Sequence, residues 1–573
     1  MNRTIWLRRS LLGAVGLIGA LLALAVVLVP YHLWDALSFG NWSQQIARGE
    51  PLGLDPAVTA VFRQRPLFYW LQGGLWALLG VDERVGRLLA FGFFVLLAAS
   101  LFVMVRREDR SGLRAPLALA LLLMSPEAIA LAAAGLSDIP AAAMVAVTGV
   151  VAFAPGASSR KRLIGLVVLA ASTGLAKPSV FPALAGLALA TLIGPREDLR
   201  ARLLDRVAPL TVGVAVAGAY LVHQSRKLDL GLGEVLSAGN AGPHSTSRCD
   251  STGCEQVAEL AGRLRLGAAL EFLWMGPFLR PYLVFALVYA GLRLLGREHR
   301  PAALVAAAAS LLLPWFGAIV TNGSLRSGLF TSPAAVAYAI PTGLLLALAA
   351  LVPPESGPSR RDLARAVVWA APPVAIWLAL TPFGVRLLAP GWPALLTLMA
   401  LAVAPALSGA TTRGRSVTAV VAAILLGGLA LNVRDLDNLD SLAPRPGGSL
   451  AVLWDLARDP FLGPERAREL ANPELGRTLR KLRPVLGEDG RVITSDGRMR
   501  FFFGGRVTMG FPRDCRAVAG HRALLLLTNP VSSSLQPGPT RDPRWWTSRC
   551  DAVIVDELPG RYALLMLGSE DGQ

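Results

Sequence analysis

Two aspartates lie next to apolar segments, at positions where a carboxylate could do acid–base chemistry. Asp35 follows the first apolar segment in "YHLWDALSFG", and Asp138 lies between two later segments in "GLSDIPAAA". A partly desolvated carboxylate has a raised pKa, and such a group can act as a general base. Asp is also a good N-cap for a helix, so capping is the alternative role at both positions.

Several cations lie beside the same kind of segment. Guanidinium groups offer fork geometry to a phosphate, and a lysine side chain can also reach one. One anionic ligand, such as a membrane-anchored phosphate, would explain the whole set; snorkelling and separate contacts with lipid headgroups are the competing explanation. The cations are Arg63 and Arg65 in "VFRQRPLFYW", Lys177 in "STGLAKPSVFP", Arg326 in "TNGSLRSGLF" and Arg386 in "TPFGVRLLAPGW".

The elements that would position these residues are membrane-spanning helices. Of the 573 residues, 53% are hydrophobic and only 17% are charged. Apolar blocks of near-spanning length predict an α-helical polytopic membrane protein with about 13 transmembrane helices. The blocks lie near residues 11–30, 85–105, 115–132, 139–155, 163–176, 178–194, 207–222, 276–294, 302–320, 333–352, 366–380, 387–407 and 416–432.

The distribution of basic loops predicts the orientation. Alternate connections carry the basic residues, and this bias marks the cytoplasmic side. It also accounts for the formal net charge of +17 without nucleic acid, so we expect no nucleic-acid partner. We expect a multi-pass protein of the bacterial inner membrane with a cytoplasmic N-terminus. The basic loops are residues 3–9, 106–110, 158–162, 195–206, 296–300, 358–365 and 411–415.

This orientation places residues 31–84, 223–275 and everything after about 433 outside the cytoplasm. Residues 31–84 contain two amphipathic stretches whose Trp and Tyr residues suit the headgroup level, so we expect surface helices there. The five cations also fall on the outer side, against the usual charge bias. We therefore define a transmembrane domain, residues 1–433, that includes this first outer loop.

The segment 434–573 has a different character. Its hydropathy falls, and β-like runs appear at 491–496, 522–529 and 551–567, the last with the pattern of a hairpin around Pro559 and Gly560. These features predict a periplasmic α/β domain of about 140 residues, large enough to bury its own core.

The four cysteines lie outside the apolar blocks. Cys249 and Cys254 share one polar loop, and Cys515 and Cys550 lie in the C-terminal segment. If both regions are extracytoplasmic, two disulfides are expected; four unrelated thiols are the alternative.

Other chemistry has little support. The chain contains no G-x-x-x-x-G-K-[ST] and no H-E-x-x-H motif, and its 5 histidines are scattered. ATP hydrolysis and His-based metal catalysis are therefore not indicated. No cofactor is predicted. The outer carboxylates are compatible with a divalent metal but do not require one.

The order of these motifs resembles the lipid-dependent glycosyltransferases of the GT-C fold, in particular the aminoarabinose transferase and protein O-mannosyltransferase group. The resemblance begins with Asp35 and continues through "ARGE", the Arg65-Pro66 segment and "GVDERVGRLLAF". It extends to Asp138, to "GLAKPSVFPAL", to "VRLLAPGWPALL" and to "FFFGGRV", so it covers nearly the whole chain.

The resemblance implies a transferase that moves a sugar from a polyprenyl-phosphate carrier to an extracytoplasmic lipid, glycan or protein. Asp35 would be the catalytic base and Asp138 a second carboxylate near the sugar. Arg65 and Lys177 would hold the carrier phosphate, with Arg326 and Arg386 among the donor-phosphate-binding cations. Such a displacement needs a base on one side of the anomeric carbon and positive charge on the other. The resemblance assigns no role to Arg63, so contact with a lipid remains its interpretation.

Three positions depart from the pattern of these enzymes. Ala36 stands where many have an acid after the aspartate, Arg65 replaces a lysine before proline, and Leu387 replaces a tyrosine after Arg386. The sugar and the acceptor are therefore not predicted.

Two other classes of protein would use the same features. A transporter or flippase of a lipid-linked or anionic substrate also needs many helices and interfacial cations. Transporters usually place their polar site near the midplane between repeated halves, and no strong internal repeat is found here. A non-catalytic scaffold that binds a cell-envelope partner through residues 434–573 is the other alternative.

Overall fold

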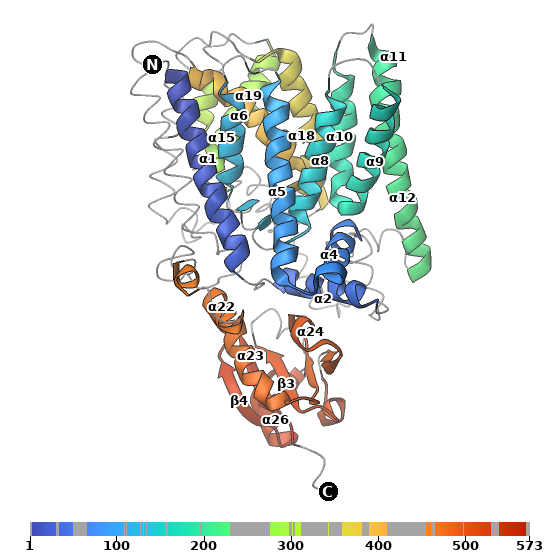
Figure 1. The fold of residues 1–573 in the computed structure, drawn as a ribbon, viewed down its shortest axis with the longest axis vertical. Coiled ribbons are helices and arrows are strands. Elements are labelled where there is room, and N and C mark those ends of the chain that lie inside the picture. Colours follow the sequence, from blue (N-terminus) through green and yellow to red (C-terminus); the bar gives the residue numbers. More distant parts are fainter. Residues whose placement is uncertain are drawn as a thin grey trace. The chain divides into compact units, whose positions relative to one another are not determined.

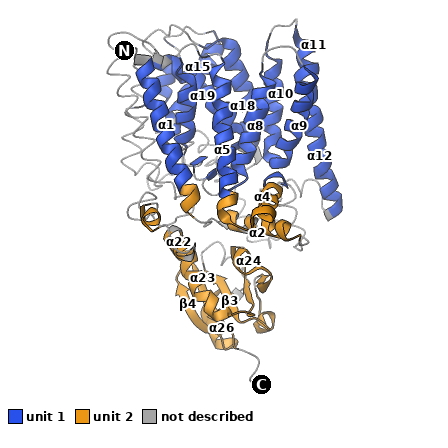
Figure 2. Ribbon diagram, viewed as in Figure 1, with its two compact units in different colours: residues 1–24, 53–68, 87–450 blue, residues 25–52, 69–86, 451–573 orange. Residues whose placement is uncertain are grey.

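The computed structural model forms two compact units (Figure 2). Unit 1 comprises residues 1–24, 53–68 and 87–450, and unit 2 comprises residues 25–52, 69–86 and 451–573. The residues that the structure describes are 3–29, 34–49, 66–107, 109, 112–125, 128–129, 131–132, 135–154, 159–194, 198–229, 276–296, 301, 304–310, 342, 358–380, 389–408, 454–459, 464–496, 498–510, 512–528 and 538–568.

Unit 1 is helical, and its helices lie side by side (Figure 1). Within the described residues, three helical stretches are long and apolar enough to cross a membrane: Ile5–Leu28, Glu83–Arg106 and Leu199–Lys227. The elements are α1 (Arg3–Leu28), α5 (Glu83–Arg106), α6 (Arg114–Leu123), α8 (Asp138–Ala152), α9 (Arg160–Ala176), η1 (Pro178–Val180), α10 (Phe181–Leu192), α11 (Leu199–Arg202), η3 (Leu203–Val207), α12 (Ala208–Leu228), α15 (Gly276–Leu294), α18 (Arg360–Leu380) and α19 (Trp392–Ser408); the last turn of α1 and the first of α5 belong to unit 2.

These helices confirm the predicted polytopic α-helical membrane protein. Most of the predicted apolar blocks coincide with a helix, for example 85–105 with α5 and 207–222 with α12. Block 416–432 and block 333–352, apart from residue 342, lie outside the described residues, so the total number of spans stays a prediction.

Small residues let the helices of unit 1 approach closely. A Cβ added at Gly213 in α12 would lie 2.5 Å from the carbonyl oxygen of Val167 in α9, and one at Gly186 in α10 would lie 2.4 Å from that of Trp369 in α18. Only glycine allows such backbone contact, which is typical of helix packing in membranes. The two contacts fix α9 and α10, which flank one of the predicted site residues, Lys177.

Unit 2 contains a five-stranded sheet in the order β2-β1-β3-β5-β4. The first three strands are parallel, and β5 is antiparallel to β3 and β4. Its elements are α2 (Trp34–Arg48), most of α4 (Pro66–Leu79), α22 (Pro464–Ala471), α23 (Pro473–Leu486), β1 (Val492–Thr494), α24 (Arg498–Phe503), η5 (Gly504–Arg506), β2 (Val507–Met509), η6 (Cys515–Val518), β3 (Ala523–Leu527), η7 (Gly538–Arg541), α26 (Pro543–Arg549), β4 (Val553–Leu558) and β5 (Tyr562–Met566).

Helix α23 covers the sheet with one apolar face. Asn472 caps the helix by accepting a hydrogen bond from the Leu475 N–H at 3.1 Å. The buried leucines recur at helical spacing. A separate buried cluster of unit 2 includes Leu524, Trp546 and Leu565. The buried leucines of α23 are Leu475, Leu479, Leu482 and Leu486.

The three β-like runs predicted in the C-terminal segment are strands β1, β3 and the β4–β5 hairpin, in which Gly560 adopts a positive φ of 71°. Strand β2 was not predicted, because its three residues are too few to show an alternating pattern. The boundary predicted at residues 433/434 lies outside the described residues.

The two amphipathic stretches of the first outer loop are helices α2 and α4. The hydroxyl of Ser43 in α2 donates to Gln72 Oε1 in α4 at 3.2 Å, and a Cβ at Gly73 would lie 2.7 Å from Ile46 Cγ2. The helices therefore pack against each other through a buried, partly polar contact. Their predicted position at the membrane surface stays a prediction.

Candidate functional site

Two of the predicted site residues meet inside unit 1. Lys177 Nζ donates a hydrogen bond to Asp138 Oδ1 and forms an ion pair with it. The two side chains are only 2% and 5% exposed. A buried charge pair among membrane helices is expensive, so its presence favours a functional role.

Asp138 is held at the first residue of α8. The N-cap of this helix is Ser137, whose side chain makes no capping hydrogen bond. Pro140 follows inside the first turn, where its missing N–H costs nothing. Ser137 rather than Asp138 is therefore the N-cap residue, and the Asp138 carboxylate pairs with Lys177. A negative charge at this end also complements the helix dipole.

Lys177 lies at the break between α9 and α10. Its backbone is extended, with φ −170° and ψ 139°, because a residue that precedes a proline is pushed out of the helical region. Pro178 then begins η1 and α10 follows. The break turns the lysine side chain into the protein, so Lys177 does not snorkel outward.

Other polar side chains are buried in α8, α9 and η1. The hydroxyls of Thr148 in α8 and Thr173 in α9 lie 3.1 Å apart, and both residues are buried. Close to Lys177 in the chain, Ser179 Oγ is buried and has no hydrogen-bond partner among the described residues. Helices α8 and α9 and the turn η1 therefore bury hydroxyl groups in addition to the charged pair.

The pair supplies a fixed positive charge next to a carboxylate. An ammonium group is a compact donor suited to a phosphate oxygen, and a neighbouring carboxylate offsets the cost of burying it. The carboxylate can also orient the ammonium or accept a hydrogen bond from a hydroxyl. These are the properties required to hold an anionic leaving group.

Asp35 lies in the first turn of α2, one residue after its first residue, in unit 2. Its side chain is outside the described part of the structure, so neither its role as a base nor a capping role is tested. Helix α2 packs against α24 as well as α4. The segments that hold α24 therefore position the helix that carries Asp35.

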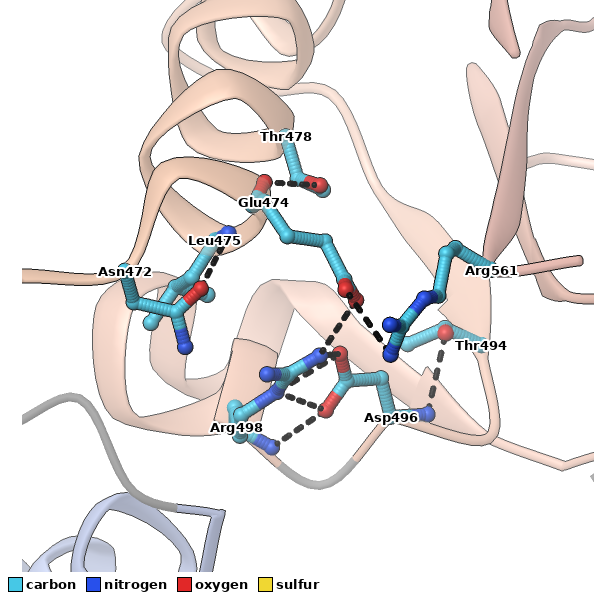
Figure 3. A network of polar contacts seen from close by, with 8 residues as sticks. All are labelled: Asn472, Glu474, Leu475, Thr478, Thr494, Asp496, Arg498 and Arg561. Carbon is cyan, nitrogen blue, oxygen red and sulfur yellow. Dashed lines mark hydrogen bonds and ion pairs between the residues drawn. The ribbon is translucent and has the colours of Figure 1, made fainter. Parts of the chain in front are cut away.

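A polar network fixes the start of α24 (Figure 3). The guanidinium group of Arg498 donates to Asp496 Oδ2 at 2.8 Å, and Asp496 N–H donates to Thr494 Oγ1 at 3.0 Å. In α23, Glu474 Oε1 lies 3.9 Å from Arg498 Nη2, and Glu474 Oε2 lies 3.7 Å from Arg561 Nη1. The network ties α24 to α23, to β1 and to the β4–β5 turn.

A second contact joins α24 and α22 to the first outer loop, and sequence reasoning missed it. Arg468 forms an ion pair with Glu83, and its guanidinium carbon lies 4.6 Å from the ring centroid of Phe502. The rings of Trp76 and Phe501 lie 6.5 Å apart. Glu83 and Arg468 are separated by 385 residues, so no local sequence signal could have paired them.

Of the other predicted site residues, the described part of the structure brings together only the two cysteines of unit 2. Cys515 and Cys550 form a disulfide with a Cα–Cα distance of 5.4 Å, which closes a segment in unit 2. Among the described residues, no group of three or more His, Cys, Asp or Glu side chains could hold a metal ion. Outside the described residues lie Arg63, Arg65, Cys249, Cys254, Arg326 and Arg386.

The helical unit and the α/β segment that follows it define the fold of the GT-C class of polytopic membrane proteins. The crystal structure of ArnT, an aminoarabinose transferase, from Cupriavidus metallidurans bound to undecaprenyl phosphate matches 98% of this chain and 98% of its own. The TM-score is 0.53 and the sequence identity 13%, so the likeness establishes a shared fold.

The same ArnT in the apo state matches 97% of each chain with a TM-score of 0.44 and 14% identity. No protein-family profile matches the sequence. No curated protein sequence matches it either.

Proposed function

We propose that this chain is an integral-membrane glycosyltransferase that moves a sugar from a polyprenyl-phosphate carrier to an extracytoplasmic lipid, glycan or protein. The observation that carries the proposal is the buried Asp138–Lys177 pair within a GT-C fold. The ArnT structure of the same fold contains undecaprenyl phosphate, which supports a carrier of this kind here.

In the proposed reaction, a hydroxyl oxygen of the acceptor attacks the anomeric carbon of the sugar while Asp35 takes its proton. The bond between that carbon and the phosphate oxygen breaks, and the electron pair leaves with the carrier phosphate. A single displacement inverts the anomeric configuration. Lys177 and Arg65 stabilise the departing phosphate, since positive charge is most effective where negative charge develops.

Asp138 acts on the same side as Lys177. It holds the ammonium in place, and it is a second carboxylate near the sugar. Arg326 and Arg386 complete the proposed set of cations for the donor phosphate. The orientation proposed for the chain, with the N-terminus in the cytoplasm and residues after about 433 outside, puts this chemistry on the periplasmic side.

The test is transfer by the purified full-length protein in liposomes, supplied with several polyprenyl-phosphate sugars and candidate acceptors. We expect Asp35→Asn and Lys177→Met each to lower the rate at least about 100-fold. Lys161→Met is the matched control because Lys161 is an exposed lysine in the first turn of α9. Its rate should not change.

Two results would contradict the proposal. Transfer that is unaffected in Asp35→Asn would remove the assigned base. Movement of the intact lipid-linked sugar across the bilayer, without transfer, would instead identify a flippase. Labelling of single cysteines placed after residue 454 with an impermeant reagent tests the orientation, and labelling from the cytoplasmic side would overturn it.

A further inference from the structure

Trp392, the first residue of α19, buries an indole N–H that has no acceptor among the residues that the structure describes. The side chain is 1% exposed, and its Nε1 makes no hydrogen bond within that part of the chain. Two other buried tryptophans are satisfied: Trp76 Nε1 donates to the carbonyl oxygen of Asp82 at 2.7 Å, and Trp546 Nε1 donates to that of Thr540 at 3.0 Å. A buried indole N–H usually has such a partner.

The surroundings of Trp392 make the unpaired donor costly. Residues 389–396 are all buried, so the start of α19 is enclosed on every side. A buried donor without an acceptor costs the free energy of its desolvation, whereas a phenylalanine would bury a similar apolar ring without that cost. An acceptor that arrives with a ligand would explain why this position carries an indole.

Helix α18 runs towards the end of unit 1 that holds Lys177. Its first turns lie at the end of α10, where Arg361 Nε and Arg365 Nε donate to the carbonyl oxygen of Ile193 at 3.3 and 3.1 Å. Helix α10 begins shortly after Lys177 and packs along α18. The two helices are therefore antiparallel, and the last turn of α18 lies at the Lys177 end.

Helix α19 starts from that same end. It packs against α18, and residues 381–391 connect the two helices. Short connections join antiparallel neighbours in helical bundles. Helix α8, which begins with Asp138, packs against both α19 and η1, and η1 contains the buried Ser179 Oγ that has no hydrogen-bond partner among the described residues. Two unpaired polar groups, from Trp392 and Ser179, therefore accompany the charge pair at this end of unit 1.

The chemistry of these two groups fits a sugar better than a phosphate. An indole N–H and a hydroxyl are neutral, whereas charged donors such as the Lys177 ammonium bind phosphate oxygens most strongly. A sugar presents hydroxyl and ring oxygens that accept hydrogen bonds from neutral donors. A few such polar groups in an otherwise apolar site orient a ligand and provide specificity.

We propose that Trp392 and Ser179 form a subsite for the donor sugar. The indole N–H of Trp392 donates to a hydroxyl or ring oxygen of the sugar, and the Ser179 hydroxyl makes a second hydrogen bond. The inference rests on the proposed glycosyltransferase function, because it concerns the sugar that the carrier phosphate bears. The two residues determine which sugar binds, since a buried polar group left unpaired by the wrong sugar weakens its binding.

The experiment measures binding to the purified full-length protein in detergent by native mass spectrometry, without an acceptor. The probes are undecaprenyl phosphate and the same carrier bearing aminoarabinose or mannose. In the wild type we expect one of these sugars to raise the affinity above that of the bare carrier. Trp392→Phe should weaken binding of that sugar-bearing carrier about tenfold, because a buried sugar oxygen loses its donor, and should leave binding of the bare carrier unchanged. Ser179→Ala should act in the same direction.

A second measurement keeps the volume of the side chain. Benzothienylalanine has the shape of tryptophan but carries sulfur in place of the indole N–H. In place of Trp392 it should leave the thermal unfolding midpoint unchanged or raise it, because no hydrogen bond within the protein is lost. In place of Trp546 it should lower the midpoint, because the Thr540 carbonyl loses its donor. This comparison stands even if Trp392→Phe does not fold.

Three outcomes would overturn the proposal. Equal losses of sugar-bearing and bare carrier in Trp392→Phe would mean contact with the phosphate or the prenyl chain. A lowered midpoint with benzothienylalanine in place of Trp392 would mean that the indole is bonded within the protein. Wild-type binding that neither sugar changes would remove the subsite.

The proposed function is judged separately, by transfer in the presence of acceptors. A wild type that binds the sugar through Trp392 but transfers nothing would contradict the function and keep the subsite. Transfer by the wild type, with sugar binding unchanged in Trp392→Phe, would contradict the subsite alone.

Discussion

Unit 1 and unit 2 each contain an ion pair between residues far apart in the chain, and the two pairs have different surroundings. Asp138 and Lys177 are 5% and 2% exposed among apolar helices. In unit 2, Arg477 in α23 pairs with Asp556 in β4, with exposed fractions of 41% and 7%. The Asp138–Lys177 pair, called the sealed pair below, is buried on both sides. In the Arg477–Asp556 pair the arginine side chain is exposed to solvent.

The partners of the two pairs also differ. Asp556 accepts two hydrogen bonds from Arg477, at 2.9 and 2.5 Å, and a third from the Tyr562 hydroxyl at 2.5 Å. This pair lies at the edge of the interface between α23 and the sheet, where the leucines of α23 already provide the apolar contact. Its role is to stabilise the domain. The helices around Asp138 and Lys177 need no charges to pack, and a charge pair kept among such helices favours the functional role proposed for it.

The largest effect should come from breaking the sealed pair. Lys177→Met leaves the Asp138 carboxylate buried without the Lys177 ammonium. Asp138→Asn leaves the Lys177 ammonium buried without the Asp138 carboxylate. We expect each change to destabilise the protein by about 3–5 kcal/mol and to lower transfer at least about 100-fold. Thermal unfolding and transfer rates measure the two effects.

The double variant separates the two roles of this pair. Asp138→Asn with Lys177→Met removes both charges, so most of the lost stability should return while transfer stays abolished. If transfer returned together with stability, the pair would be structural, and the contrast with Arg477–Asp556 would disappear.

The disulfide tests whether the stability of unit 2 is a property of unit 2 alone. Cys515 and Cys550 are 35 residues apart, and replacing both by serine should destabilise the fold of this region by about 3–4 kcal/mol through the greater freedom of the unfolded chain. Limited proteolysis should show earlier cleavage after residue 464. In the protein without the disulfide, Lys177→Met should still lower the transfer rate as it does in the wild type. If it no longer did, the function of unit 1 would depend on the stability of unit 2.

The Glu83–Arg468 pair gives an intermediate case, because its side chains are 19% and 4% exposed. Arg468→Gln should cost about 2 kcal/mol, since it removes a charged hydrogen bond and the contact with Phe502. Exchanging the charges, with Glu83→Arg and Arg468→Glu, should restore part of this loss.

Arg466→Gln provides the matched control, because Arg466 pairs with Glu469 while 60% exposed. Its unfolding midpoint should change little. If the charge exchange restores nothing, Arg468 acts mainly through Phe502.

The sequence predicted those elements whose signals are local. Helices α8 and α9 follow from their apolar lengths, the break at Lys177 from Pro178, and the β4–β5 hairpin from two alternating runs around Pro559 and Gly560. The placement of Asp138 and Lys177 at the outer boundary, which uses only the order of segments and loops, stays a prediction.

Pairing between distant residues could not be predicted in the same way. The Asp138–Lys177 pair joins residues 39 apart, and it exists because of how α8 packs against α9 and η1. Capping was the alternative role considered for Asp138, since Asp has a high propensity for helix N-termini. The hydrogen bonds from Arg361 and Arg365 in α18 to the Ile193 carbonyl after α10 could not be predicted either, because separate basic loops do not show which helix ends meet.

The smallest expected effects concern the pH dependence of unit 2. At the acid end, burial tends to raise the pKa of Asp556, but the hydrogen bonds from Arg477 and Tyr562 outweigh it and hold the pKa below its usual value. Because its pKa is lowered, the ionised Asp556 carboxylate stabilises the folded state at pH values above the ordinary pKa of aspartate. This contribution is lost as the pH falls through the lowered pKa. Asp556→Asn should therefore flatten the decline in unfolding midpoint under acid conditions.

At the alkaline end the sign reverses. Burial and the neighbouring Asp556 carboxylate raise the pKa of Tyr562 to about 12, above its ordinary value of 10.0. The protonated phenol therefore stabilises the folded state fully below pH 10, and this contribution is lost as the pH rises towards 12. Tyr562→Phe should cost about 1 kcal/mol at neutral pH and reduce the loss of stability between pH 10 and 12. Unfolding midpoints of both proteins across this range measure the effect, and parallel curves would show that the Tyr562 phenol makes no pH-dependent contribution to stability.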